Sequence, residues 1–73
     1  MNIKLIWDFR GPDARGIAEH YKIHLDEYAL KNHIEAESCI EEITGMYCTA
    51  WMTVSSADSD KVKSALRPHR EEN

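Results

Sequence analysis

Hydrophobic and polar residues alternate over the first nine positions of the chain. The apolar side of this segment carries Ile3, Leu5, Trp7 and Phe9. A period of two predicts a β-strand over residues 2–9 with one strongly apolar face. Gly11 and Pro12 then interrupt the alternation and favour a turn.

The spacing of apolar residues becomes helical over residues 14–33, which predicts a long amphipathic helix. Its apolar stripe carries Ile17, Ala18, Tyr21, Leu25, Tyr28 and Ala29. Asp13 stands just before the helix and is a candidate N-cap. Ile23 and Leu30 lie outside the stripe, seven residues apart, and form a second, narrower apolar ridge.

Residues 34–55 predict a β-hairpin with Gly45 in its turn. A two-residue turn would set glutamates on the apolar face, where burying a carboxylate is costly. A three-residue turn over 44–46 avoids this, and it pairs Ile40 with Ala50, Ser38 with Met52, and Ala36 with Val54.

The same register separates the two cysteines. It places Cys48 in the core and Cys39 beside Trp51 on the opposite face of the sheet. Because the two thiols then point to opposite sides, we expect no disulfide between them.

The last predicted element is a short helix that follows the hairpin. Residues 55–60 are rich in side chains that cap helices, and Val62, Ala65 and Leu66 follow with helical spacing. Pro68 ends this helix. The sequence thus predicts a single α+β domain over residues 1–67 and a flexible C-terminal tail over 68–73.

The order strand, helix, strand, strand, helix (βαββα) predicts a small two-layer α+β fold of the split β-α-β type. It resembles the architecture of ferredoxin-like folds that lack the last strand. From the right-handed crossover rule we expect the first strand to lie beside the third and parallel to it. The sheet order is then 1-3-2, with both helices on one face. An architecture of this kind does not specify a function.

The face of the sheet without helices then has a partly apolar surface rimmed by carboxylates. The candidate interface residues on it are Ile6, Cys39, Ile43, Tyr47 and Trp51. The first strand also lacks a neighbour on its outer edge, which leaves backbone groups unpaired. Since burying each large apolar side chain contributes roughly 1.5–3 kcal/mol, a second copy would stabilise so small a chain. We therefore predict a homodimer that uses this open face and the edge of the first strand.

Composition restricts the other partners. The chain has 73 residues, with 9 basic and 13 acidic side chains and a net charge of −4. The acidic balance and the glutamates between positions 35 and 42 argue against nucleic acid. The sequence contains no signal peptide and no membrane span, so we expect a cytoplasmic protein with free thiols. It predicts no cofactor and no catalytic residue, and it favours a protein that is not an enzyme.

An alternative function is the binding of a metal ion or a small anion where the first strand meets the long helix. His20 and His24 have the i, i+4 spacing that lets two imidazoles share a metal, and Glu27 follows on the same side. Asp8 or His69 would supply a fourth ligand.

The anion would use backbone N–H groups at the start of the long helix, together with charged side chains nearby. The candidate residues for this site are Arg10, Gly11 and Arg15. The loop does not match the P-loop pattern or the dinucleotide-binding glycine pattern.

Overall fold

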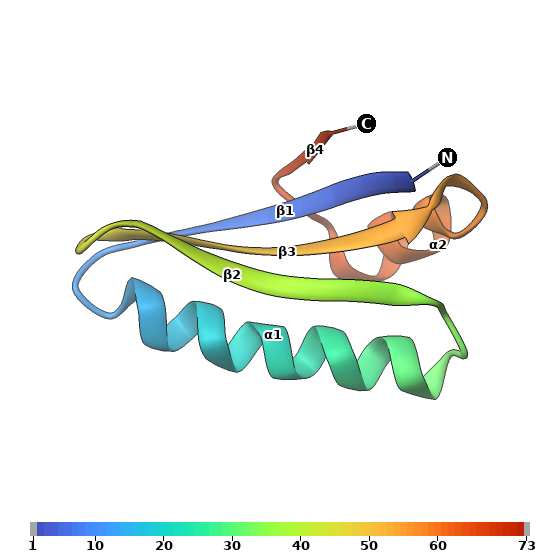
Figure 1. The fold of residues 1–73 in the computed structure, drawn as a ribbon, viewed down its shortest axis with the longest axis horizontal. Helices are drawn as coiled ribbons and strands as arrows, with labels where there is room; N and C mark the ends of the chain where they lie inside the picture. Colours follow the sequence, from blue (N-terminus) through green and yellow to red (C-terminus); the bar gives the residue numbers. More distant parts are fainter. Residues whose placement is uncertain (1, 73) are drawn as a thin grey trace.

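The computed structural model describes residues 2–72. Its elements are β1 (Asn2–Arg10), α1 (Ala14–Lys31), β2 (Ala36–Thr44), β3 (Tyr47–Ser55), α2 (Ser56–Leu66) and β4 (Arg70–Glu72). The strands form one sheet in the order β2-β3-β1-β4. The long helix α1 runs along the sheet, and α2 follows β3 near one end of it (Figure 1). The two-layer α+β fold predicted from the sequence is confirmed.

The predicted neighbours in the sheet are correct, but the predicted direction of one pair is wrong. β3 lies between β1 and β2, as expected, and pairs antiparallel with both. The crossover rule applies to β1 and β2, the two strands that flank α1, and these two do run in the same direction. β3 returns from β2 through a hairpin, so it must oppose both of its neighbours.

The hairpin has the predicted register but a different turn. Ala36 faces Val54, Ser38 faces Met52, and Ile40 faces Ala50. The turn is shorter than predicted, because Thr44 pairs with Tyr47 and leaves only residues 45 and 46 between them. A β-bulge between Glu42 and Thr44 takes up the extra residue. The bulge preserves the apolar pairing that the sequence pattern required.

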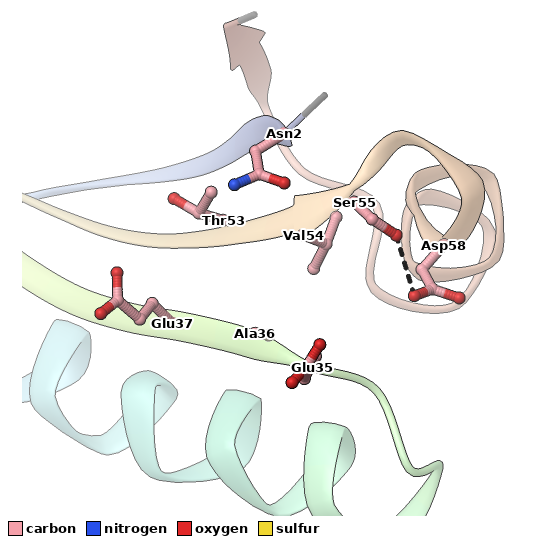
Figure 2. A pocket seen from close by; sticks show the side chains of 8 residues that line it. All are labelled: Asn2, Glu35, Ala36, Glu37, Thr53, Val54, Ser55 and Asp58. Carbon is pink, nitrogen blue, oxygen red and sulfur yellow. Dashed lines mark hydrogen bonds between the residues drawn. The ribbon is translucent and has the colours of Figure 1, made fainter.

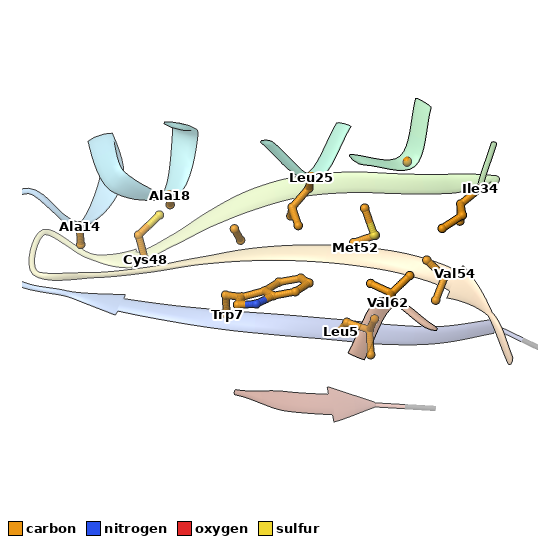
Figure 3. Packing of buried hydrophobic residues seen from close by; sticks show 12 residues of the cluster. Leu5, Trp7, Ala14, Ala18, Leu25, Ile34, Cys48, Met52, Val54 and Val62 are labelled. Atoms are coloured by element: carbon orange, nitrogen blue, oxygen red, sulfur yellow. The ribbon is translucent and has the colours of Figure 1, made fainter. Parts of the chain in front are cut away.

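The core lies between the sheet and the two helices (Figure 3). Its largest buried side chains are Trp7, Leu5, Leu25, Met52, Val54, Val62 and Cys48. Val62 of α2 packs in the same cluster as Leu25 of α1, so both helices cover the same face, as predicted. The indole N–H of Trp7 donates to the backbone oxygen of Leu66 at 3.0 Å. This bond fixes the end of α2 against β1.

Two details of α1 differ from the predictions. Ile17, which the pattern placed on the apolar stripe, is exposed because it stands at the margin of the buried side. Asp13 occupies the N-cap position but makes no side-chain capping bond. The buried residues of the helix are Ala14, Ala18, Leu25 and Ala29. Three of these four are alanines, so the helix can approach the sheet closely.

The C-terminal segment is ordered in a way that the sequence did not predict. Residues 70–72, expected in a flexible tail over 68–73, form β4 and pair antiparallel with β1 from Lys4 to Ile6. His69 adds two bonds: its N–H donates to the oxygen of Ile6 at 2.9 Å, and its Nδ1 accepts the N–H of Asp8 at 2.8 Å. The outer edge of β1, predicted to be unpaired, is therefore covered between Lys4 and Asp8. Met1 and Asn73, which the predicted ranges included, lie outside the described residues.

Candidate functional site

The face of the sheet opposite the helices has a shallow groove of about 180 Å³, which we call the open-face groove. Its lining residues are Lys4, Ile6, Glu41, Ile43, Tyr47, Thr49, Trp51, Arg70 and Glu72. They alternate along their strands with the core residues, so the period of two that builds the core also assembles this surface. Every strand of the sheet contributes to it.

The predicted interface residues share this face but differ in exposure. Trp51 and Tyr47 are half-buried, and Cys39 and Ile43 are exposed. Cys39 faces Trp51 across the strand pair, as the hairpin register predicted. Ile6 is different, because only 4% of its surface is exposed. Its neighbours in the sheet are Trp51 of β3 and Arg70 of β4, a strand that the sequence did not predict. The prediction that Ile6 is an exposed interface residue is therefore wrong, because these neighbours leave it buried.

A polar cluster at one end of the groove ties β4 to the rest of the sheet. The hydroxyl of Tyr47 donates to Oδ1 of Asp8 at 2.6 Å. Arg70 donates to the same carboxylate through Nε, 3.0 Å from Oδ2, and Nη2, 2.8 Å from Oδ1. The hydrogen bond from Arg70 is the main cause that lowers the pKa of Asp8, and the bond to Asp8 raises the pKa of Tyr47. We call Asp8, Tyr47 and Arg70 the Asp8 cluster.

The sequence pattern did not predict the Asp8 cluster, because Arg70 falls within the expected flexible tail over residues 68–73. The signal in the sequence was a carboxylate at Asp8 between two large apolar residues, Trp7 and Phe9, since a partly buried carboxylate requires a partner. The pairing joins residues 62 positions apart in the chain. No local pattern could indicate which cation would supply the partner.

Two further cations lie on aromatic rings of the open face. Lys4 Nζ is 4.5 Å from the ring centroid of Trp51, and Arg10 Cζ is 4.1 Å from that of Tyr47. Both contacts are cation–π interactions. The basic side chains of the open face thus come from β1 and β4, which also carry Asp8 and Glu72, while the β2 side of the face carries Glu41 and other carboxylates. The β2 side of the open face is therefore purely acidic, and the β1 and β4 side carries charges of both signs.

The residues predicted for an anion site do not converge on one centre. Arg10 stacks on Tyr47, and the N–H of Gly11 donates to the oxygen of Met46 at 2.7 Å. Arg15 lies 3.7 Å from Glu42 in an ion pair on the helix side of the sheet. Each candidate group thus has its own contact elsewhere.

The histidines predicted for a metal site do lie together. The Nε2 atoms of His20 and His24 are 2.9 Å apart. Glu27 is 3.4 Å from Nδ1 of His24, on the opposite side of that ring from Nε2. The two further ligands that the sequence suggested, Asp8 and His69, bond to other groups. Within residues 2–72, no set of three or more His, Cys, Asp or Glu side chains is placed to hold a metal ion.

A hollow of about 350 Å³ lies where the start of β2 and the end of β3 meet the start of α2 (Figure 2). Its lining residues are Asn2, Glu35, Ala36, Glu37, Thr53, Val54, Ser55 and Asp58. The hydroxyl of Ser55 donates to Asp58 at 3.1 Å. The remaining carboxylates, Glu35 and Glu37, are exposed. Acidic side chains in contact with solvent do not by themselves indicate a ligand.

Comparisons with known proteins leave the function to be inferred from this geometry. No helix within residues 2–72 has the length and apolar character needed to cross a membrane. No protein-family model, curated protein or solved structure matches the chain.

Proposed function

We propose that the protein is a homodimerising interaction module whose two copies meet through their open faces. The observation that carries this proposal is that, on the face of the sheet opposite both helices, Ile43 is exposed and Trp51 and Tyr47 are only half-buried. A second copy is the simplest cover, because two-fold dimers are the commonest oligomers. The proposal no longer includes the edge of β1, which β4 covers.

The charge pattern of the face favours one orientation of the two copies. Lys4 and Glu37 both pair with Thr53, so they lie in one row across the sheet. A two-fold axis parallel to the strands keeps each row level and sets Glu37 opposite the partner's Lys4. An axis across the strands would instead stack β2 on β2 and oppose carboxylates. The proposed dimer therefore has its axis along the strands.

The same axis brings the apolar centre of the face onto itself. Trp51 lies between Cys39 and Ile6 in the next row. Rotation about the strand direction places this row over its own copy, so the partner's copy of the same row shields each indole. Exposed apolar surface is thus buried while the acidic and basic margins meet.

The size of the face predicts how tightly the copies associate. Three strands of nine residues span roughly 30 Å by 14 Å. Two such faces give an area of about 850 Å², which is below the roughly 1,200–2,000 Å² of stable specific interfaces and typical of weak, transient ones. We therefore expect a dimer that dissociates on dilution.

A reducing compartment such as the cytoplasm is part of this proposal, because Cys39 has an exposed free thiol. We also propose that the strand order β2-β3-β1-β4 makes this a ferredoxin-like fold. The dimer requires no cofactor, and the glutamates of the face disfavour nucleic acid as its partner.

Sedimentation velocity over micromolar to millimolar concentrations tests the dimer. We expect the wild type to show a concentration-dependent dimer and Trp51→Glu to remain monomeric, because it buries a carboxylate at the centre of the face. Leu30→Glu is the matched control, since Leu30 is 81% exposed on α1 and away from the sheet. A wild type that is monomeric throughout, or a Trp51→Glu variant that dimerises as well as Leu30→Glu does, contradicts the proposal.

A charge exchange tests the orientation. Lys4→Glu and Glu37→Lys should each weaken the dimer, and the double variant should restore it. If the double variant is weaker than both single variants, the axis does not run along the strands.

A further inference from the structure

Two imidazole rings, those of His20 and His24, meet in a T-shaped arrangement on the exposed side of α1, away from the open face. The Nε2 atoms of His20 and His24 are 2.9 Å apart, and the ring centroids are separated by 4.6 Å. Glu27 lies 3.4 Å from Nδ1 of His24. The geometry points to a binding site for a divalent transition metal, Cu²⁺ or Ni²⁺, that uses both Nε2 atoms as ligands.

The distance between the two nitrogens, which is also that of a hydrogen bond, can be compared with the geometry that each metal requires. Two imidazole nitrogens about 2.05 Å from a metal and at right angles lie about 2.9 Å apart, whereas tetrahedral ligands at the same distance lie about 3.3 Å apart. The observed 2.9 Å fits adjacent positions around a square-planar or octahedral ion. Those are the arrangements that Cu²⁺ and Ni²⁺ adopt with nitrogen and oxygen ligands.

Glu27 acts as a positioning residue for this site. A carboxylate beside Nδ1 of His24 favours the tautomer with hydrogen on that nitrogen, which leaves a lone pair on Nε2. Without metal, Nε2–H of His20 then donates to that lone pair. When the metal binds, this hydrogen moves to Nδ1 of His20, and the net charge of the two rings is unchanged. Metal binding therefore costs the exposed hydrogen bond between His20 and His24 and a change of tautomer in His20.

Water would complete the coordination of the metal. Within the described residues no third histidine, cysteine or carboxylate joins the pair in a ligand set. Both rings are exposed, so the remaining positions are open to solvent. The site is therefore an open two-histidine chelate.

Isothermal titration of the full chain with NiCl₂ tests the site. We expect the wild type to bind one ion per chain, and His20→Ala and His24→Ala each to lose roughly tenfold or more in affinity. His33→Asn is the matched control: it removes an exposed histidine at a positive φ of 55°, a conformation that asparagine tolerates. Cys39→Ser tests the exposed thiol as a competing site. Both controls should bind Ni²⁺ as the wild type does.

Two further readouts separate a metal site from a structural histidine pair. Glu27→Gln should weaken Ni²⁺ binding several-fold while the helical circular dichroism stays unchanged, because the carboxylate acts only through His24. The ring-proton resonances of His20 and His24 should respond to Ni²⁺ before those of His33 and His69. No binding at millimolar Ni²⁺, equal affinity in His20→Ala, or loss of binding in Cys39→Ser would overturn the proposal.

Discussion

Replacing Asp8 by asparagine should loosen the C-terminal strand. Asp8→Asn keeps the shape of the side chain but removes the charge that holds two Arg70 bonds and one Tyr47 bond. Hydrogen bonds to charged groups contribute about 1.5–3 kcal/mol when they are well covered, and exposed ion pairs only about 0–1 kcal/mol. The side chain of Asp8 is 18% exposed and that of Arg70 is 48% exposed, so this cluster falls between the two cases.

We therefore expect Asp8→Asn to lower the free energy of unfolding by about 1–2 kcal/mol. For a domain of this size, that corresponds to a fall in Tm of about 5–15 °C. Thermal and urea denaturation followed by circular dichroism measure the change. Asp60→Asn is the matched control, because its side chain is 94% exposed in an ion pair with Lys63 and should cost far less.

The stabilisation that Asp8 contributes should decrease as the pH falls. Arg70 lowers the folded-state pKa of Asp8, so the stabilisation is fully present above the unfolded pKa of about 3.9 and is lost as pH falls through the folded value. The difference between wild type and Asp8→Asn should be constant near neutral pH and shrink in acid. An equal loss in Asp8→Asn and Asp60→Asn, or a difference that persists in strong acid, would refute the role given to this cluster.

Two other perturbations test the core and the cysteines. Leu25→Ala removes a fully buried side chain of α1 and should cost about 2–5 kcal/mol in urea denaturation, a large part of the total for so short a chain; a cost below 1 kcal/mol would contradict the packing. Cys39 should react with a thiol reagent in the folded protein, while Cys48 stays protected, because burial raises the pKa of the Cys48 thiol. Mass spectrometry of the labelled chain would contradict this expectation if both cysteines react at the same rate.

The features that the sequence predicted best are those set by local periodicity. The hairpin register followed from keeping glutamates off the face that Met52 and Val54 occupy, and it is confirmed even though the turn has a different length. The long helix and the short helix also follow from spacing and from the break at Pro68. In each case the signal lies within a few residues of the element that it predicts.

The features that the sequence did not predict depend on contacts between distant residues. β4 is three exposed residues long and has no alternation of its own, so it depends on the unpaired edge of β1 and on the bonds between Arg70 and Asp8. Ile6 was expected on an exposed surface. It is buried instead, between its neighbours on β3 and on the unpredicted strand β4. The spacing of His20 and His24 predicted their proximity. It could not predict which nitrogen of His24 lies near Glu27, because that depends on the side-chain rotamers of both residues.

The position of β1 in the sheet determines when this protein can finish folding. β1 needs partners from residues 47–55 and 70–72, which are synthesised after it. The segment of α1 can form its helix locally during translation. β1 cannot pair until β3 and β4 have been synthesised, and until then Leu5 and Trp7 stay exposed to solvent. Such long-range pairing slows folding and leaves a nascent chain prone to aggregation. Incomplete chains that end before β3 should therefore be poorly soluble.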